Sequence, residues 1–192
     1  MELVADSRVL YACLVLAVGV ERLVELVLSR RNAAWAFERG GVEYGREHFP
    51  LMATLHTGFL FGAVAEVWWL DRPFVPELGW PALAVAAIAQ ALRYWSILTL
   101  GRRWNVRVIV VPEAPAIANG PYRWLRHPNY LAVIAEGLAL PLVHTAWGTA
   151  AIFSGLNAWL LWVRIRCEER ALEKHNRYRE QLQGRAGVFP GL

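Results

Sequence analysis

Five predominantly apolar stretches are the feature that most constrains how this chain can fold. They lie at residues 9–28, 51–70, 80–100, 129–145 and 147–165. A bilayer crossing needs about 20 mostly apolar residues, and a helix satisfies its own backbone hydrogen bonds in lipid. We therefore predict an all-α, polytopic membrane protein with about five transmembrane helices. The last two stretches are so close together that they should form a tight helical hairpin.

The composition agrees with a membrane protein. Hydrophobic residues make up 56% of the 192 residues and charged residues only 19%, which is more apolar than a soluble domain usually is. The net charge of +4 does not indicate nucleic acid, because the basic residues fall between apolar runs and form no single face. Cys13 and Cys167 lie far apart without ligand spacing, so we expect neither a metal site nor a disulfide framework.

The distribution of arginines predicts the orientation. Most basic residues lie in three regions, at 29–50, at 101–128 and after residue 165. The opposite side carries only Arg8 and Arg72. Because basic loops stay in the cytoplasm, the N-terminus should lie outside and the C-terminus inside. An odd number of spans requires the same arrangement.

The chain reads as one membrane-embedded domain over residues 1–192, with three spans in residues 1–100. After residue 165 the charges alternate in sign at helical spacing, which predicts a surface helix that continues the fifth span. Glycines end this helix, and Val188-Phe189-Pro190 could then fold back onto the protein.

Several ionisable residues interrupt the apolar stretches, although each costs roughly 2.5–3.5 kcal/mol on insertion scales. They are Glu21, Arg22, Glu25, His56, Glu66, Arg93 and Glu136. Glu21 and Glu25 stand four residues apart and share one helix face. Some of these residues line a polar pocket, with Glu21, Glu25 and His56 as candidate substrate contacts, or they form interhelical ion pairs, for example Glu66 with Arg93.

The most informative segment is GPYRWLRHPNY at residues 120–130, just before the fourth span. Gly-Pro sets a turn, and Pro128 keeps His127 out of a helix while favouring a helix start after it. Aromatic, arginine and histidine side chains stand between the two prolines. On physical grounds alone this rigid loop could equally be an anchor at the membrane interface.

A second polar element, RIRCEE, ends the fifth span. Arg164 and Glu168 stand at positions i and i+4, so their side chains share one face of the helix. Taken alone, such a pair is more often a salt bridge within the helix than a functional site.

Together, GPYRWLRHPNY and RIRCEERALEKHNRYREQL resemble the isoprenylcysteine carboxyl methyltransferase family over roughly residues 101–190. The resemblance implies that this half binds S-adenosylmethionine and that the cytoplasmic C-terminal helix forms part of the cofactor pocket. It implies that Arg164 holds the methyl acceptor. The implied cofactor contacts are Ala114, Pro115, Ala116, Ile117, Tyr122, His127, Pro128, Asn129, Tyr130 and Glu168.

The N-terminal half adds a narrower resemblance. The segments ERLVELVLSRRNAAW, EYGREHFPLMATLHTGF and WNVRVIVVP are similar to a bacterial subfamily associated with type III polyketide synthases. That resemblance implies a protein of the bacterial inner membrane that methylates a lipophilic small molecule, such as an alkylpyrone or alkylresorcinol hydroxyl. Membrane lipids and a type III polyketide synthase are the implied partners.

Methyl transfer to oxygen suits these residues, because Arg164 can hold an anionic oxygen in a fixed geometry. An isoprenylcysteine-like or other lipid carboxylate is an alternative acceptor. Two other functions are also possible from the sequence. One is a membrane reductase that uses NADPH, with Arg102, Arg103 and Arg107 near the 2′-phosphate, and the other is a non-enzymatic lipid-binding scaffold. A soluble methyltransferase is excluded, because no strand followed by a glycine-rich GxGxxG turn is present.

Overall fold

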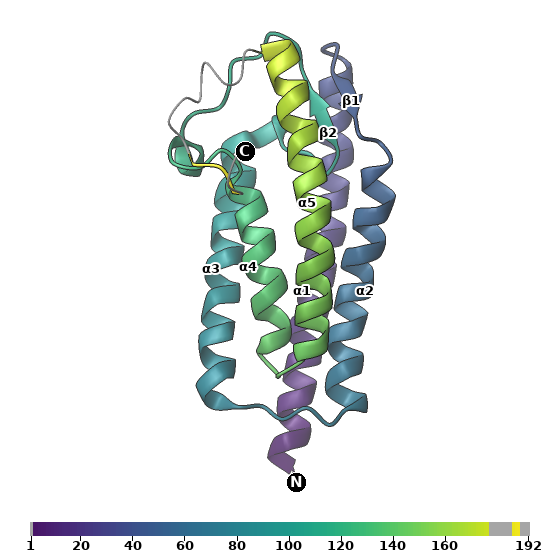
Figure 1. Cartoon of the computed structure of the whole chain (residues 1–192), viewed down its shortest axis with the longest axis vertical. Helices are drawn as coiled ribbons and strands as arrows, with labels where there is room; N and C mark the ends of the chain where they lie inside the picture. Colours follow the sequence, from purple (N-terminus) through teal and green to yellow (C-terminus); the bar gives the residue numbers. More distant parts are fainter. Residues whose placement is uncertain (1, 177–185, 189–192) are drawn as a thin grey trace.

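The computed structural model describes residues 2–176 and 186–188, and five long helices dominate it (Figure 1). They are α1 (Glu2–Phe37), α2 (His48–Trp69), α3 (Pro76–Leu100), α4 (Pro128–Leu142) and α5 (Trp147–Asn176). Successive helices run in opposite directions. Helix α3 packs against α4, α4 against α5, and α2 against both α5 and α1. The predicted bundle of five helices is confirmed.

The two ends of the bundle differ in how the chain connects the helices (Figure 1). At one, the turn end, residues 70–75 join α2 to α3 and residues 143–146 join α4 to α5. At the other, the loop end, residues 38–47 and 101–127 form the connections. The predicted tight hairpin is confirmed, because four residues suffice to reverse the chain between α4 and α5, with Thr145 at a left-handed φ of 55°.

Helix α1 is much longer than the apolar stretch that predicts it. It continues to Phe37, and its last turns carry polar side chains that bind the loop end. Ser29 Oγ donates to Asn105 Oδ1 at 2.8 Å, and Asn32 Nδ2 donates to the Trp104 carbonyl at 2.7 Å. These bonds replace hydration of the polar helix face, so hydrophobicity alone does not set the length of the helix.

The loop end also contains a small sheet that the sequence did not predict. Strand β1 (Val42–Tyr44) pairs antiparallel with β2 (Val108–Val110), and Val42 faces Val110. Arg107 and Glu43 form an ion pair of 3.1 Å beside it. Strands of three residues are too short to show an alternating pattern, and these two are far apart in the sequence, so the sequence alone predicts loops in both places.

The predicted extension of the fifth span is confirmed, since α5 continues through the charged segment to Asn176. Arg177 and Tyr178, which we also expected in this helix, lie outside the described residues. Val188 packs against the cluster of Tyr130, Leu161 and Ile165, so this part of the C-terminal segment does fold back. Phe189 and Pro190 lie outside the described residues.

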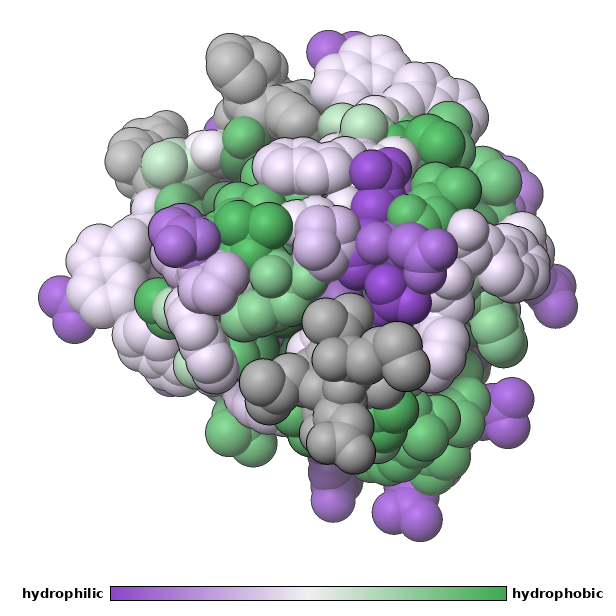
Figure 2. All heavy atoms as spheres, turned by 90° about the horizontal axis from the view of Figure 1, so that it is seen from below, coloured by the Kyte–Doolittle hydropathy of each residue, from purple (hydrophilic) through white to green (hydrophobic). Residues whose placement is uncertain are grey.

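The bundle has the surface of a protein in contact with lipid. Large apolar side chains are exposed along its helices, among them Leu10, Leu16, Phe61, Ile88, Leu98 and Ile152. Seen from the turn end, hydrophilic side chains gather in one patch with apolar ones around it (Figure 2). Within the described residues, the stretches His48–Trp69 and Pro76–Arg103 are long and apolar enough to cross a membrane. Crossing by all five helices stays a prediction.

Candidate active site

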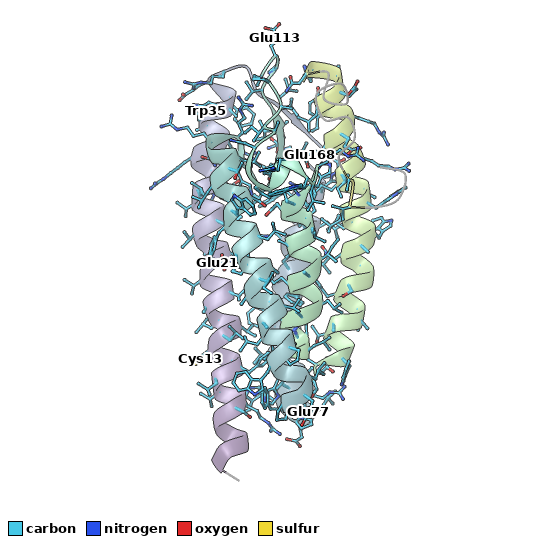
Figure 3. The ribbon with its side chains drawn as sticks, turned by 90° about the vertical axis from the view of Figure 1, so that its left-hand side faces the viewer. Cys13, Glu21, Trp35, Glu77, Glu113 and Glu168 are labelled. Carbon is cyan, nitrogen blue, oxygen red and sulfur yellow. The ribbon has the colours of Figure 1, made fainter. Side chains whose placement is uncertain are left out.

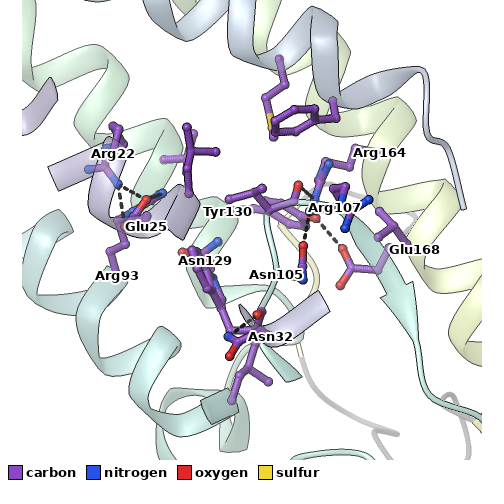
Figure 4. Close-up of a pocket in the computed structure, with 18 of the residues that line it drawn as sticks. Arg22, Glu25, Asn32, Arg93, Asn105, Arg107, Asn129, Tyr130, Arg164 and Glu168 are labelled. Atoms are coloured by element: carbon purple, nitrogen blue, oxygen red, sulfur yellow. Dashed lines mark hydrogen bonds and ion pairs between the residues drawn. The ribbon is translucent and has the colours of Figure 1, made fainter. Parts of the chain in front are cut away.

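A cavity of about 800 Å³ extends from the loop end into the bundle. Its wall is formed mainly by α1, α2, residues 102–117, the end of the loop before α4, the first turns of α4 and the last turns of α5. The wall is polar near the loop end (Figure 4) and apolar deeper in the bundle. Polar and apolar ligand groups could therefore occupy one continuous space.

Tyr130 joins the two motifs that the sequence singled out. Arg164 Nε donates to the Tyr130 hydroxyl at 2.8 Å, and this hydroxyl donates to the Glu168 carboxylate (Figure 4). Arg164 is buried and also donates to the Val106 carbonyl through Nη2. Among the described ion pairs none joins Arg164 to Glu168, so a simple helix salt bridge does not explain these two residues. Instead, a tyrosine from α4 fixes both side chains at the cavity.

His127 and Arg126 are held by a carboxylate that the sequence analysis missed. Glu169 Oε1 lies 3.1 Å from His127 Nε2 and accepts a hydrogen bond from Arg126 Nη1 at 2.9 Å. All three groups have little exposure, so the loop before α4 is fastened to α5 at a protected point. The sequence does show two adjacent carboxylates after the fifth span, Glu168 and Glu169. The rotation of α5 about its axis decides which of them contacts the loop before α4.

Asn129 has a polar atom at the cavity wall that no described residue satisfies. Its Oδ1 is buried, and among the described residues nothing donates a hydrogen bond to it. A buried acceptor of this kind costs about 1–3 kcal/mol unless a donor reaches it. An amino or hydroxyl group of a ligand would supply that donor, so the residues present fit a nucleoside or amino acid ligand.

Most predicted site residues meet at this cavity. Of the predicted cofactor contacts, all except Pro128 line it, and so do the predicted substrate contacts Arg164, Glu25 and His56. Pro128 is instead buried in the first turn of α4, where its ring fixes the helix start. Glu21 lies about midway along α1 (Figure 3) and accepts a hydrogen bond from Gln90.

Buried ion pairs cross the bundle beside the cavity. Glu25 accepts hydrogen bonds from Arg93 Nε and Nη2, each at 2.6 Å, and from Arg22 Nη1 at 2.8–2.9 Å (Figure 4). Arg22 Nη2 also donates to Glu136 at 3.0 Å. The interpretation as interhelical ion pairs is thus confirmed for these residues, which link α1 to α3 and α4. We call Arg22, Glu25, Arg93 and Glu136 the charged layer.

The predicted pair of Glu66 with Arg93 is wrong. Glu66 accepts from Arg72 Nη2 at 2.7 Å and from the backbone N–H groups of Gly148 and Thr149 at the start of α5. It therefore lies at the turn end, far along α2 from the charged layer. A carboxylate at a helix N-terminus satisfies N–H groups that have no partner within the helix, which explains this placement.

The deeper part of the cavity is an apolar groove between α1 and α2. Its wall includes Val15, Gly19 and Leu23 from α1, and Leu60 and Val64 from α2. A Cβ atom at Gly19 would stand 3.6 Å from Leu60, an ordinary contact distance. We call this part the α1–α2 groove; its chemistry suits an aliphatic chain.

The sequence of this chain is similar to those of known proteins. The model of the isoprenylcysteine carboxyl methyltransferase (ICMT) family matches residues 82–174, which include the loop before α4 and the Arg164–Glu168 face of α5. The uncharacterized protein YpbQ of Bacillus subtilis is 37% identical over 158 residues, covering 82% of this chain and 93% of the relative. The chain belongs to the ICMT family. An uncharacterized protein of Haemophilus influenzae is 29% identical over 168 residues, with 86% and 94% of the two chains covered.

Membership of the ICMT family implies a membrane methyltransferase, and the enzymes of this family generally use S-adenosylmethionine. The two apolar helices agree with a membrane location. The family match begins in α3, so α1 and α2, which form the apolar groove, lie outside it.

Proposed function

We propose that this protein is an S-adenosylmethionine-dependent O-methyltransferase of the bacterial inner membrane that methylates a lipophilic acceptor. The observation that carries this proposal is the continuity of the cavity, which joins a hydrogen-bonding pocket at the loop end to the α1–α2 groove. One ligand with polar groups and a second with an aliphatic tail could meet at this junction. The loop end would face the cytoplasm, where the cofactor is dissolved.

The pocket at the loop end is suited to the cofactor, which supplies an electrophilic methyl group when it is bound. Glu168 can accept hydrogen bonds from the ribose or the amino group, and Asn129 Oδ1 can accept one from an amine. The backbone of residues 114–117 lines the same region. Tyr122 and Tyr130 offer aromatic faces, and a cation over such a face gains about 0.5–2 kcal/mol.

Arg164 is suited to the acceptor. Its Nε and Nη2 groups are held by Tyr130 and Val106, so the guanidinium is fixed at the wall of the cavity. A fixed positive group would hold the acceptor oxygen in line with the methyl group, and correct alignment accounts for much of the rate in such displacements. The aliphatic tail would then occupy the α1–α2 groove.

Among acceptors, we favour the hydroxyl of an alkylpyrone or alkylresorcinol, such as a type III polyketide synthase makes. Each combines a small polar ring with a single aliphatic chain, which matches a polar junction above an apolar groove. A lipid carboxylate of the isoprenylcysteine kind fits the same positions for its oxygen and its tail. Direct comparison of the two acceptor classes with the purified enzyme distinguishes them.

Titration with S-adenosylhomocysteine tests the cofactor pocket. We expect micromolar binding to the purified protein by calorimetry. Glu168→Gln should weaken it by about ten- to a hundredfold, because a hydrogen bond to a charged group contributes about 1.5–3 kcal/mol. The matched control is Glu77→Gln, whose carboxylate is exposed at the turn end (Figure 3). Absence of binding by the folded wild-type protein would contradict the proposal, and binding of NADPH in its place would favour a reductase.

A further inference from the structure

We propose that His56 accepts the proton of the acceptor hydroxyl, and that the natural acceptors include phenols that are still protonated near neutral pH. The inference rests on the proposed function and deepens it. His56 is half-buried on α2 and lines the cavity, but it lies outside the residues that match the family. Its role therefore has to be argued from its contacts in this protein.

The tautomer of His56 is set by a backbone hydrogen bond. Its Nδ1 lies 2.9 Å from the Met52 carbonyl oxygen, which can only accept, so Nδ1 carries the proton. In the neutral ring Nε2 then has the free lone pair. Among the described residues no group forms a hydrogen bond to Nε2. A proton acceptor is thus available in the wall of the cavity.

The ring is also held in a fixed orientation. Phe153 of α5 packs edge-on against it, with ring centroids 5.2 Å apart and an interplanar angle of 88°. Phe153 itself belongs to the core cluster with Phe59 and cannot move freely. A base held on two sides keeps its alignment with the acceptor, which general base catalysis requires.

The charges of the cavity wall suit a developing oxyanion. Arg22, Arg93 and Arg164 line the same cavity as His56, from α1, α3 and α5. Arg22 and Arg93 share the carboxylate of Glu25, whereas the described ion pairs give Arg164 no carboxylate partner. An acceptor oxygen between Arg164 and His56 would face a positive group on one side and a proton acceptor on the other.

The step balances without a further reactant. As the acceptor oxygen forms its bond to the methyl carbon, the bond between that carbon and sulfur breaks and sulfur keeps the electron pair. The hydroxyl proton moves to Nε2 of His56, which later releases it to water. An acceptor that is already anionic has no proton to transfer and does not need His56.

This difference provides the test. We would compare an alkylresorcinol, a phenol that stays protonated near neutral pH, with a 4-hydroxy-2-pyrone of the same chain length, an acidic enol that is already ionised. The variant is His56→Asn, whose side-chain N–H can still donate to Met52 but which lacks Nε2. We expect kcat for the alkylresorcinol to fall by about a hundredfold or more, at least about tenfold more than kcat for the pyrone.

A second readout does not depend on turnover. Calorimetry of the alkylresorcinol with cofactor-free protein should show binding to His56→Asn weakened by about three- to tenfold, the effect of one lost hydrogen bond. Equal loss of kcat for both acceptors, or no loss for either, would overturn the role of His56 while leaving the proposed function intact. If the wild-type protein binds S-adenosylhomocysteine but methylates neither compound, the proposed acceptor class fails, and this inference with it.

Discussion

The two ends of the cavity are built by different parts of the chain and have opposite chemistry. At the loop end the wall comes largely from residues 102–130 and from α5, and it presents Glu168, Asn129 and Arg164. The α1–α2 groove comes from the first two helices and presents mainly aliphatic side chains. The family match covers the first region and none of the second.

This difference shows where a family likeness is informative. Transfer of a methyl group needs hydrogen-bonding groups in a fixed geometry, so similar chemistry requires similar residues at the loop end. An aliphatic tail needs only apolar space of suitable width, which many combinations of side chains can provide. The family therefore indicates the donor, whereas under the proposed function the acceptor would be selected by α1 and α2.

The largest effect is expected where the two regions meet, at the charged layer. Arg93→Ala leaves the buried Glu25 with Arg22 as its remaining described partner, and loss of one member of a buried pair costs about 3–5 kcal/mol. We expect that decrease in the free energy of unfolding, measured in detergent with increasing denaturant. The double variant Glu25→Leu with Arg93→Leu should lose less, because it buries no uncompensated charge. An unchanged stability of Arg93→Ala would show that the charged layer does not hold the two regions together.

A substitution at the turn end should affect stability without affecting either part of the cavity. Glu66→Ala removes the acceptor for the N–H groups of Gly148 and Thr149, which should cost about 1–3 kcal/mol of folding stability. The affinity for S-adenosylhomocysteine should stay within about twofold of the wild-type value. A larger change in affinity would mean that the start of α5 is coupled to Glu168 at its far end.

Narrowing the α1–α2 groove should affect the acceptor and spare the cofactor. Gly19→Phe places a ring in the groove, and extra side-chain volume in a packed space costs about 1–3 kcal/mol. We expect kcat/KM for a long-chain acceptor to fall about tenfold, with unchanged binding of S-adenosylhomocysteine. Gly155→Phe is the matched control, because Gly155 is exposed on α5 with open space at its Cβ position. Equal losses in both variants would contradict the assignment of the tail to this groove.

The smallest expected effect is on the chemical reactivity of Cys167, on α5 near the loop end. Burial raises the pKa of the Cys167 thiol above its usual range, and the carboxylates of Glu47 and Glu168 add to the rise. Since the thiolate is the reactive form, Cys167 should react more slowly with iodoacetamide near neutral pH than an ordinary exposed thiol, and faster as the pH rises. Mass spectrometry of a Cys13→Ser variant would measure this rate. Rapid reaction near neutral pH would show that this side of α5 is more open than the structure indicates.

The sequence predicted more of the fold than of the candidate site. Apolar length predicts five helices, and Pro128 predicts the start of α4, because both depend on local chemistry. The sequence also brings Arg164 and Glu168 to one helix face. It did not predict the contact of Tyr130 with both residues, since that contact depends on how α4 packs against α5.

The helical bundle, the rigid loop between its two prolines and the family of the chain all follow from the amino-acid sequence alone. The packing of the helices places Glu169 against His127 and Glu168 against Tyr130, and it pairs Arg93 with Glu25 instead of Glu66. The physical reason is that helical periodicity fixes which residues share a face, but not which face meets which neighbour. Outward-facing aliphatic side chains in a membrane bundle differ little from those in its core, so helix rotation is encoded by the few polar contacts that packing brings together.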